Sequence, residues 1–345
     1  MIIYSKDSGL NNAMIGKLET PLKMIIEHES DLQREKNSIQ KMLFNVEKSK
    51  KFGETIIGNS EFSVFSAASE GAGAENDSIQ ETFKKLIEHI QFMKEFTITA
   101  QMMEDANYGV AADAKRRAEN FTRAYYMTMN KICSAALING TESSATFAKA
   151  SIDLTSPDGL PLFHKAHKFH TDKMKSKTQA NYFVKNGFSS STDGVESMLN
   201  ELSNRIRNMK DEGGDPLGYI ADTIILPGNR PGLEAMVKKV CGSERTAGSA
   251  NNDINIQYGN WNLVVLPDWQ PTRNEFMVMS SEANKNLSGN MFFNRVPLTV
   301  SNWVDHHTGN YIWTGRCRFG VGFGSWKHIA KIVDAASLTE AETIT

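Results

Sequence analysis

The chain has 345 residues, of which 40% are hydrophobic and 23% charged, a composition that allows a folded core. A net charge of -2 excludes the overall basic character of a protein whose main ligand is nucleic acid, and three scattered cysteines without a CxxC pair exclude a disulfide framework or zinc site and indicate a reducing compartment. The first residues turn polar too early for a signal peptide, and no apolar run approaches the roughly 18 residues of a membrane span.

The first predicted helix follows an irregular start and covers residues 20–48. Thr20 and Pro21 form the pair of N-cap and first-turn proline that is typical of a helix start. Apolar positions then recur every seven residues, at Ile25, Leu32, Ile39 and Val46. So narrow a stripe buries little surface. Two interpretations stay open: a solvated surface helix, or an arm that lies on another chain.

A long β-hairpin is predicted over residues 49–96. Its tip is the stretch of small and acidic residues from Ser66 to Asp77, which has the composition of a turn or loop. One longer strand returns from Phe83 to Ile98, with apolar residues in imperfect alternation with Lys and Glu. Two strands alone are marginally stable, so we expect the hairpin to lie on another surface. A disordered surface loop is the alternative.

One long helix, over residues 110–136, gives the clearest periodic signal in the sequence. Apolar side chains recur at intervals of three and four and share one stripe: Val110, Ala114, Ala118, Phe121, Tyr125, Met129, Ile132 and Ala136. Asn139-Gly140 supplies a C-terminal stop. About 30 helical residues make a rod of roughly 45 Å, which suits an extended body better than a compact globule.

A distinctive segment follows this helix: Asp158-Gly-Leu-Pro-Leu-Phe-His-Lys-Ala-His167. It leads into a basic stretch with lysines at 165, 168, 173, 175 and 177. Such a charge run is usually a solvated face, and non-specific contact with phosphates is the alternative.

An α/β region of about 100 residues is predicted next. Ser191 to Asp193 caps an amphipathic helix that ends before Pro216. The further elements are a strand at 223–226, a helix at 232–240, and strands at 254–258, 261–266 and 275–279. Residues 296–304 and 311–319 then form a long antiparallel hairpin.

Histidines 164, 167 and 170 are the strongest candidates for chemistry, with His306 and His307 elsewhere. On a helix, His164 and His167 would stand side by side and could share a metal ion. However, His-Glu-x-x-His is missing, no acidic residue is placed nearby as a third ligand or base, and the neighbouring lysines repel cations. We therefore expect ordinary polar contacts and assign no catalytic, cofactor-binding or metal residue.

The glycines of Arg318-Phe-Gly-Val-Gly-Phe-Gly324 are spaced somewhat like those of a dinucleotide-binding loop. Neither a following helix nor a βαβ unit surrounds them, so that interpretation fails. We expect these glycines to let strands bend or let another backbone approach closely. The arm, the hairpin and the rod each have too little core of their own, which predicts a symmetric assembly.

At this point the sequence resembles the tailed-phage major capsid proteins with the Hong-Kong-97 fold, and within them the Mu-like major head subunits. The resemblance covers about residues 50–333. The segment Asp158–His167 is similar to a motif that follows the spine helix in the Mu-like group and is the most specific match. Other matching segments are Phe96–Asp105, Val195–Met209, Asp215–Tyr219, Thr223–Pro227, Trp261–Trp269, Phe276–Met279 and Arg316–Gly320.

The resemblance implies an α+β fold with five parts. They are an N-terminal arm with an amphipathic helix (1–49), an extended β-hairpin loop (50–96), a peripheral domain with the spine helix (97–190), an axial α/β domain (191–290), and a return to the peripheral domain with a C-terminal tail (291–345). Some family members cross-link a lysine to an asparagine, and no motif assigns such a pair here.

The resemblance further implies a structural subunit, not an enzyme, that forms hexamers and pentamers of an icosahedral head around double-stranded DNA. Its partners would be other copies of itself, a scaffolding protein, a maturation protease, a portal and packaged DNA contacted non-specifically, with no membrane and no cofactor. Assembly would occur in the bacterial cytoplasm and the product would be the virion shell. The alternatives are a cellular nanocompartment shell of the encapsulin type and a metal-dependent hydrolase using His164 and His167.

Overall fold

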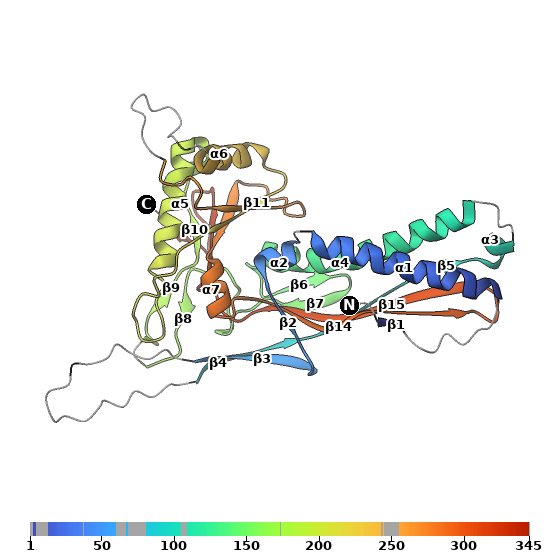
Figure 1. Cartoon of the computed structure of the whole chain (residues 1–345). Coiled ribbons are helices and arrows are strands. Elements are labelled where there is room, and N and C mark those ends of the chain that lie inside the picture. Colours follow the sequence, from blue (N-terminus) through green and yellow to red (C-terminus); the bar gives the residue numbers. More distant parts are fainter. Residues whose placement is uncertain are drawn as a thin grey trace.

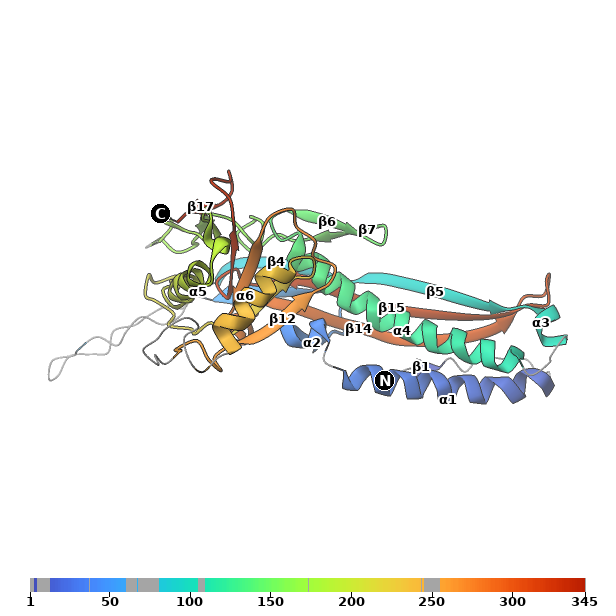
Figure 2. The same ribbon diagram turned by 90° about the horizontal axis from the view of Figure 1, so that it is seen from above.

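The computed structural model describes residues 3–4, 13–36, 38–59, 67, 81–104, 109–172, 174–242, 244 and 255–344. The described chain forms an elongated layer of strands and helices joined at one end to a more compact α/β part (Figures 1 and 2). Within the described residues, no helix is both long enough and apolar enough to cross a membrane. The three cysteines are buried and free.

The elongated layer is built on a five-stranded sheet. Strands β14 (Asn290–Val304) and β15 (Tyr311–Phe323) form its long antiparallel centre, which confirms the predicted closing hairpin. The other strands are β1 (Ile3–Tyr4) and β2 (Asn45–Lys48), both parallel to β14, and β5 (Ile90–Ile98), antiparallel to β15. The short helix α3 (Ala100–Glu104) follows β5.

Helix α4 (Gly109–Ile138) is the predicted rod, 30 residues long. The predicted stripe is buried where its side chains are described: Ala114, Ala118, Phe121, Met129, Ile132 and Ala136 are all under 9% exposed, and Tyr125 packs against them. The first half of the helix packs on α1 and the long strands, and the second half packs into the core below the compact part. The helix ends at Ile138, directly before the predicted stop at Asn139-Gly140. A side chain at Gly140 would meet the ring of Phe163 at 2.9 Å.

The N-terminal helix differs from the prediction. Helix α1 spans Ala13–Glu35, so Thr20 and Pro21 lie inside it, and a second helix, α2 (Ile39–Leu43), precedes β2. The heptad pattern therefore runs across three separate elements, and its members Leu32 and Val46 are exposed. Helix α1 ends at Glu35, and the side chain of Ser38 caps the separate helix α2.

Helix α1 lies side by side with α4 and runs in the same direction (Figure 2). Leu22 and Ile26 are buried against the first half of α4. Further along, Arg123 Nε donates to Glu29 Oε1 at 2.8 Å, and the hydroxyls of Ser30 and Tyr126 are 2.7 Å apart. The inner face of this helix is thus covered by the helix's own chain.

The two stem strands of the predicted hairpin are present in the structure. Strands β3 (Gly53–Asn59) and β4 (Glu81–Glu88) are antiparallel and make a separate two-stranded sheet. The predicted tip, apart from Ala67, lies outside the described residues. The single return strand was wrong, because it divides at His89: β4 pairs with β3, whereas β5 belongs to the five-stranded sheet.

The glycines of β15 lie under the base of this hairpin. A side chain at Gly320 would come within 2.6 Å of the carbonyl oxygen of Glu88, and one at Gly322 within 2.6 Å of Ile87. A side chain at Gly324, just after β15, would come closer still to the carbonyl oxygen of Ser288. The expectation that these glycines allow close approach is confirmed.

The compact part contains a six-stranded sheet in the order β12-β11-β13-β16-β10-β17. Its strands are β10 (Tyr182–Val184), β11 (Thr223–Pro227), β12 (Asn262–Leu266), β13 (Glu275–Met279), β16 (Ile329–Val333) and β17 (Glu342–Thr343). Residues 191–290 supply β11, β12 and β13, and the remaining strands come from outside that range. The predicted strand at 254–258 was wrong where it is described, because residues 256–258 form a turn.

Two helices cover one face of this sheet: α5 (Thr192–Arg207), capped by Ser191 as predicted, and α6 (Pro231–Gly242). The end of α4 and the segment after it pack against the other face. The remaining elements are the 3-10 helix Phe188–Ser190, α7 (Ser281–Asn286), and the small hairpins β6 (Ser144–Phe147) with β7 (Ala150–Asp153) and β8 (His167–Lys168) with β9 (Thr178–Gln179).

Candidate functional site

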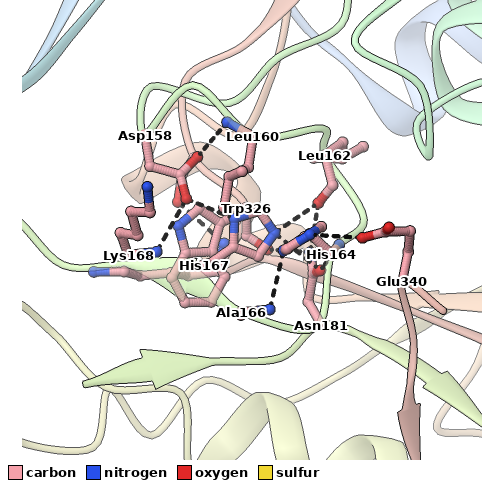
Figure 3. A network of polar contacts seen from close by, with 12 residues as sticks. Asp158, Leu160, Leu162, His164, Ala166, His167, Lys168, Asn181, Trp326 and Glu340 are labelled. Carbon is pink, nitrogen blue, oxygen red and sulfur yellow. Dashed lines mark hydrogen bonds and ion pairs between the residues drawn. The ribbon is translucent and has the colours of Figure 1, made fainter. Parts of the chain in front are cut away.

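Residues of the segment from Asp158 to Lys168 form a largely buried polar network with Asn181 and Glu340 (Figure 3). His167 is fully buried, and its Nδ1 lies 2.8 Å from Oδ2 of Asp158, whose side chain is 1% exposed. Burial alone would raise the pKa of Asp158, but the hydrogen bond and the charge of His167, with backbone amides from Lys168 and Leu160, hold that pKa below its usual value.

The other side of the His167 ring is tied to the six-stranded sheet. Its Nε2 lies 3.2 Å from the carbonyl oxygen of Leu162 and 3.1 Å from Oδ1 of Asn181, the residue before β10. The ring stacks on Trp326, just before β16, with centroids 4.4 Å apart. Asn181 Nδ2 donates to the carbonyls of Leu162 and Trp326. The network therefore fixes an irregular segment to two strands distant in sequence.

His164 connects the same segment to the C-terminal tail. Its Nε2 lies 2.9 Å from Oε2 of Glu340, and its Nδ1 accepts from the backbone amide of Ala166. The neighbouring Lys165 Nζ donates to the carbonyl oxygen of Thr339 at 2.6 Å. These contacts hold the part of the tail just before β17 against the segment that contains His164.

His170 points elsewhere, toward the hairpin. Its ring meets Phe83 of β4 edge-on, with centroids 4.9 Å apart, and its backbone amide donates to Glu212. A hollow of about 290 Å³ lies beside this contact, lined among others by Ile57, Phe83, Lys168 and Trp326. The segment thus also contacts the stem of the hairpin near the distal end of β4.

The arrangement corrects two sequence interpretations. His164 and His167 are neighbours, with ring centroids 6.0 Å apart, but they do not lie on a helix. Acidic residues do stand beside them, namely Asp158 and Glu340. A metal ion would have to displace hydrogen-bond partners of both rings, and within the described part of the chain no group of three His, Cys, Asp or Glu could hold one.

Two further buried groups were missed by the sequence analysis. Lys331 of β16 is 4% exposed and lies 3.3 Å from Glu275 of β13, whose Oε1 also accepts from Trp269 Nε1. Burial lowers the pKa of Lys331, and the carboxylate of Glu275 opposes this. His328 is fully buried, and burial lowers its pKa to about 3. Lys331 lies within β16 and His328 directly precedes this strand. The sequence around them does not indicate which residues they contact.

A second buried cation, Lys85, anchors the hairpin. Lys85 of β4 is 6% exposed, and its ammonium group donates to the carboxylate of Asp153 and, at 2.5 Å, to the hydroxyl of Thr155. Because Asp153 ends β7, this contact ties the hairpin to the small sheet that follows α4. The polar groups described here stabilise junctions between elements, and each already has a structural partner.

Comparison with known proteins gives a likeness in structure only. No protein-family model and no curated protein matches the sequence. A chain from the structure of Mycobacterium phage Patience is similar over 99% of this chain and 94% of its own, with a TM-score of 0.51 and 14% identity. A chain from the capsid of Cyanophage P-SCSP1u is similar over 88% and 89%, with a TM-score of 0.53 and 10% identity.

A chain from the capsid of the native GTA particle is similar over 87% of this chain and 92% of its own, with a TM-score of 0.50 and 12% identity. At such identities the likeness concerns the fold. The chain has a mixed helix and strand fold that matches those of phage capsid subunits.

Proposed function

We propose that this chain is the structural subunit of an icosahedral phage head with Hong-Kong-97 architecture, which self-assembles into hexamers and pentamers around double-stranded DNA. The observation that carries the proposal is the extent of the structural likeness, 99% of this chain and 94% of the phage chain. A likeness confined to the six-stranded sheet would fit many α/β proteins, whereas this one includes the long helix and the long strands.

The surface of the elongated layer supports association as the activity. Large apolar side chains are exposed on the two parallel helices and on the hairpin stems: Met24, Leu32, Met127, Ile57 and Leu86. A two-stranded sheet is marginally stable by itself, and burying apolar surface between subunits contributes about 25 cal/mol per Å². Contact with neighbouring copies is therefore the natural source of the missing stabilisation.

The five-part division follows from this proposal. Residues 1–49 would be the arm, 50–96 the extended loop, 97–190 the peripheral domain with α4 as its spine, 191–290 the axial domain, and 291–345 the return and tail. The segment Asp158–His167 is the basis for placing the chain near the Mu-like group. Its buried network gives that segment a structural role and accounts for its specific residues.

The proposed partners are a scaffolding protein, a maturation protease, a portal and packaged DNA, with assembly in the bacterial cytoplasm. The role is structural and not enzymatic. The polar clusters at His167, Lys85 and Lys331 are consistent with this, because each is committed to contacts between elements of the fold.

Co-expression with the proposed scaffolding protein, followed by negative-stain microscopy, tests the proposal. Uniform shells that protect double-stranded DNA from nuclease in the presence of the packaging proteins are the expected result. Shells that contain a cargo enzyme and no DNA would indicate a nanocompartment. Small oligomers with stoichiometric zinc or manganese, lost in His164→Ala, would support a hydrolase and overturn the proposal.

A further inference from the structure

The chain changes from one sheet to another at His89. Strand β4 ends at Glu88 and pairs with β3, whereas β5 begins at Ile90 and pairs with β15 of the five-stranded sheet. We call β3 and β4 the stem. The ring of His89 is only 6% exposed although it lies between the two sheets. A swing of the stem relative to the five-stranded sheet therefore changes the surroundings of this ring.

One nitrogen of the His89 ring has a partner that fixes its protonation. Nε2 lies 2.8 Å from Oγ of Ser49. This hydroxyl donates its own hydrogen to Oε1 of Glu54 in β3, at 2.7 Å, so it accepts from the imidazole and Nε2 carries a hydrogen. The neutral ring is thus linked through Ser49 to the other strand of the stem.

The second nitrogen of the ring, Nδ1, is buried and has no hydrogen-bond partner among the described residues. Gly320 of β15 lies against it, because a side chain at Gly320 would come within 2.8 Å of Nδ1. A proton added to Nδ1 would be a buried donor without an acceptor, and such a group costs free energy. The docked stem therefore favours the neutral form of His89.

The charges around His89 act in the same direction. Burial is the main reason that the pKa of His89 is lowered from 6.5, and the positive charges of Arg318 in β15 and Arg295 in β14 lower it further. The carboxylate of Glu54 opposes this shift without cancelling it. Arg318 is held at the junction, because its Nε donates to the carbonyl oxygen of His89 at 3.4 Å.

The other ionisable groups at the junction have partners or face solvent. Lys51 lies 3.9 Å from Glu54. Lys85 forms an ion pair with Asp153, and Glu88 is exposed. Within the described part of the chain, none of these groups accepts a hydrogen bond from Nδ1.

Opening of the stem removes the penalty on the charged ring. Apolar contacts of Ile56 and Ile87 with Met291 and Phe293 hold the stem on the sheet. A ring that leaves this junction for water has an ordinary pKa of about 6.5. Because the open state binds a proton that the docked state excludes, a lower pH favours the open state.

We propose that His89 is a pH-sensitive switch at the base of the hairpin, whose protonation releases the stem from the five-stranded sheet. The docked state has its full stability above about pH 6.5 and loses it as the pH falls below that value. The ratio of open to docked chains should rise by up to about tenfold per pH unit. This inference concerns the single chain and does not depend on the proposed function.

Fluorescence resonance energy transfer can follow the position of the stem in the dilute full-length chain. The three native cysteines are buried, so dyes can be attached to two new ones, Lys84→Cys on β4 and Lys285→Cys on α7, both at exposed positions. Energy transfer should stay constant from about pH 8 to about pH 7 and should change between about pH 6.5 and pH 5. Circular dichroism of the same samples should show a folded chain, and unfolding of the whole chain over this range would overturn the inference.

The variant His89→Gln removes the titrating group and keeps an amide that can donate to Ser49. Its energy transfer should not respond to pH, so at about pH 5 its ratio of open to docked chains should be about tenfold or more below that of wild type. The matched control His306→Gln changes an exposed histidine of a distant turn and should respond as wild type does. A response that persists in His89→Gln would overturn the inference.

Two other titrating contacts of the stem can be separated from His89. His170 meets Phe83 of β4 edge-on, and a response that is lost in His170→Gln but kept in His89→Gln would assign the switch to His170 instead. Burial would raise the pKa of Asp153, but its hydrogen bonds with Lys85 and Thr155 hold that pKa below 3.8. The ion pair of Lys85 with Asp153 therefore does not respond in the range of the experiment.

A direct titration of the wild-type chain needs no substitution at the switch. Nuclear magnetic resonance of chains with labelled histidine follows the ring of His89, which should titrate below about pH 6.5. Movement of the stem should accompany this titration. A pKa of His89 at or above 6.5 would overturn the inference, whether or not His89→Gln folds.

Discussion

His167 is the residue through which the 158–170 segment is held against the rest of the fold. One edge of its ring faces the buried carboxylate of Asp158, the other faces Asn181, and one face lies on Trp326. Removing the ring would leave a carboxylate with 1% exposure without its partner. The cost of such a change is the desolvation of the remaining charge, which exceeds the value of the pair itself.

We therefore predict that His167→Ala lowers the free energy of unfolding by about 3 kcal/mol or more. The exposed turn residue His306 provides a matched control, and His306→Ala should change stability by less than about 0.5 kcal/mol. Chemical denaturation followed by tryptophan fluorescence measures both. Equal stabilities of the two variants would show that the buried network does not support the fold.

His328 gives a pH-dependent prediction. Burial lowers its pKa from 6.5 to about 3, and its Nε2 lies 2.9 Å from Oδ1 of Asn290. The folded chain keeps the ring neutral while the unfolded chain binds a proton below about pH 6.5, so stability from this residue is complete above pH 6.5 and declines as the pH falls toward 3. The decline is about 1.4 kcal/mol per pH unit.

The variant His328→Gln isolates this contribution. It should be less stable than wild type at pH 7, but the stability gap should shrink between pH 6.5 and 5, because the variant lacks the group that titrates. Denaturation at several pH values gives both curves. A gap that stays constant or widens at lower pH would contradict the neutral, buried state of His328.

At the scale of elements, the crossing of the hairpin over β15 depends on glycine. Gly320 has the carbonyl oxygen of Glu88 where a side chain would be, at 2.6 Å, whereas Gly232 in α6 has open space around it. Gly320→Ala should cost about 1–3 kcal/mol, because backbone cannot yield as a flexible side chain does.

Gly232→Ala is the control, since it makes the same chemical change in the unfolded chain. It should be neutral or stabilising by up to about 1 kcal/mol, because alanine favours the helix. Hydrogen exchange locates the effect: amides of β4 and β5 should exchange faster in Gly320→Ala and not in Gly232→Ala. A stable Gly320→Ala chain would mean that the hairpin base can shift at no cost.

The sequence predicts the elements whose signal is local. The stripe on α4 follows a helical period from Val110 to Ala136, so the buried face of the helix could be identified without knowledge of what covers it. The seven-residue pattern from Ile25 to Val46 led to the wrong prediction of one continuous helix. The spacing continues by chance from α1 through α2 into β2, although these are separate elements. The division of the return strand at His89 was invisible, since exchanging one strand partner for another leaves the apolar alternation unchanged.

The candidate site could be predicted only in part for the same reason. The segment Asp158–His167 stood out in sequence, whereas the proximity of His164 and His167 was expected only on a helix, which they do not form. The structural role of this segment depends on contacts with Asn181, Trp326 and Glu340. The pairing of β10 with β16 and β17 places these residues near the segment. The buried Lys331 and Lys85 have partners far along the chain, and no spacing rule reveals such pairs.

At the scale of the whole molecule, α4 joins the two parts. Its first half packs with α1 and the far ends of β14 and β15, and its second half packs under the six-stranded sheet. A single long helix in both cores makes the two parts one unit. The hairpin, in contrast, contacts the body through Lys85 and Phe83 of β4 and through His89 at its base. Loss of the hairpin's distal segment should therefore separate folding from association.

This separation is testable, because Asn59 and Glu81 are paired across the hairpin and a two-residue Asn-Gly turn can join them in place of residues 60–80. The buried stem residues Lys85 and Ile87 stay in place, so we expect the free energy of unfolding of the single chain to stay within about 1 kcal/mol of wild type. Shell formation should be lost or need about a tenfold higher concentration, as sedimentation and microscopy would show. A 21-residue Gly/Ser replacement of the same length should also fail, because length alone does not supply side chains for a contact with a neighbouring copy. Normal shells from either chain would mean that subunits meet without this segment, and association would then have to depend on the exposed helices α1 and α4.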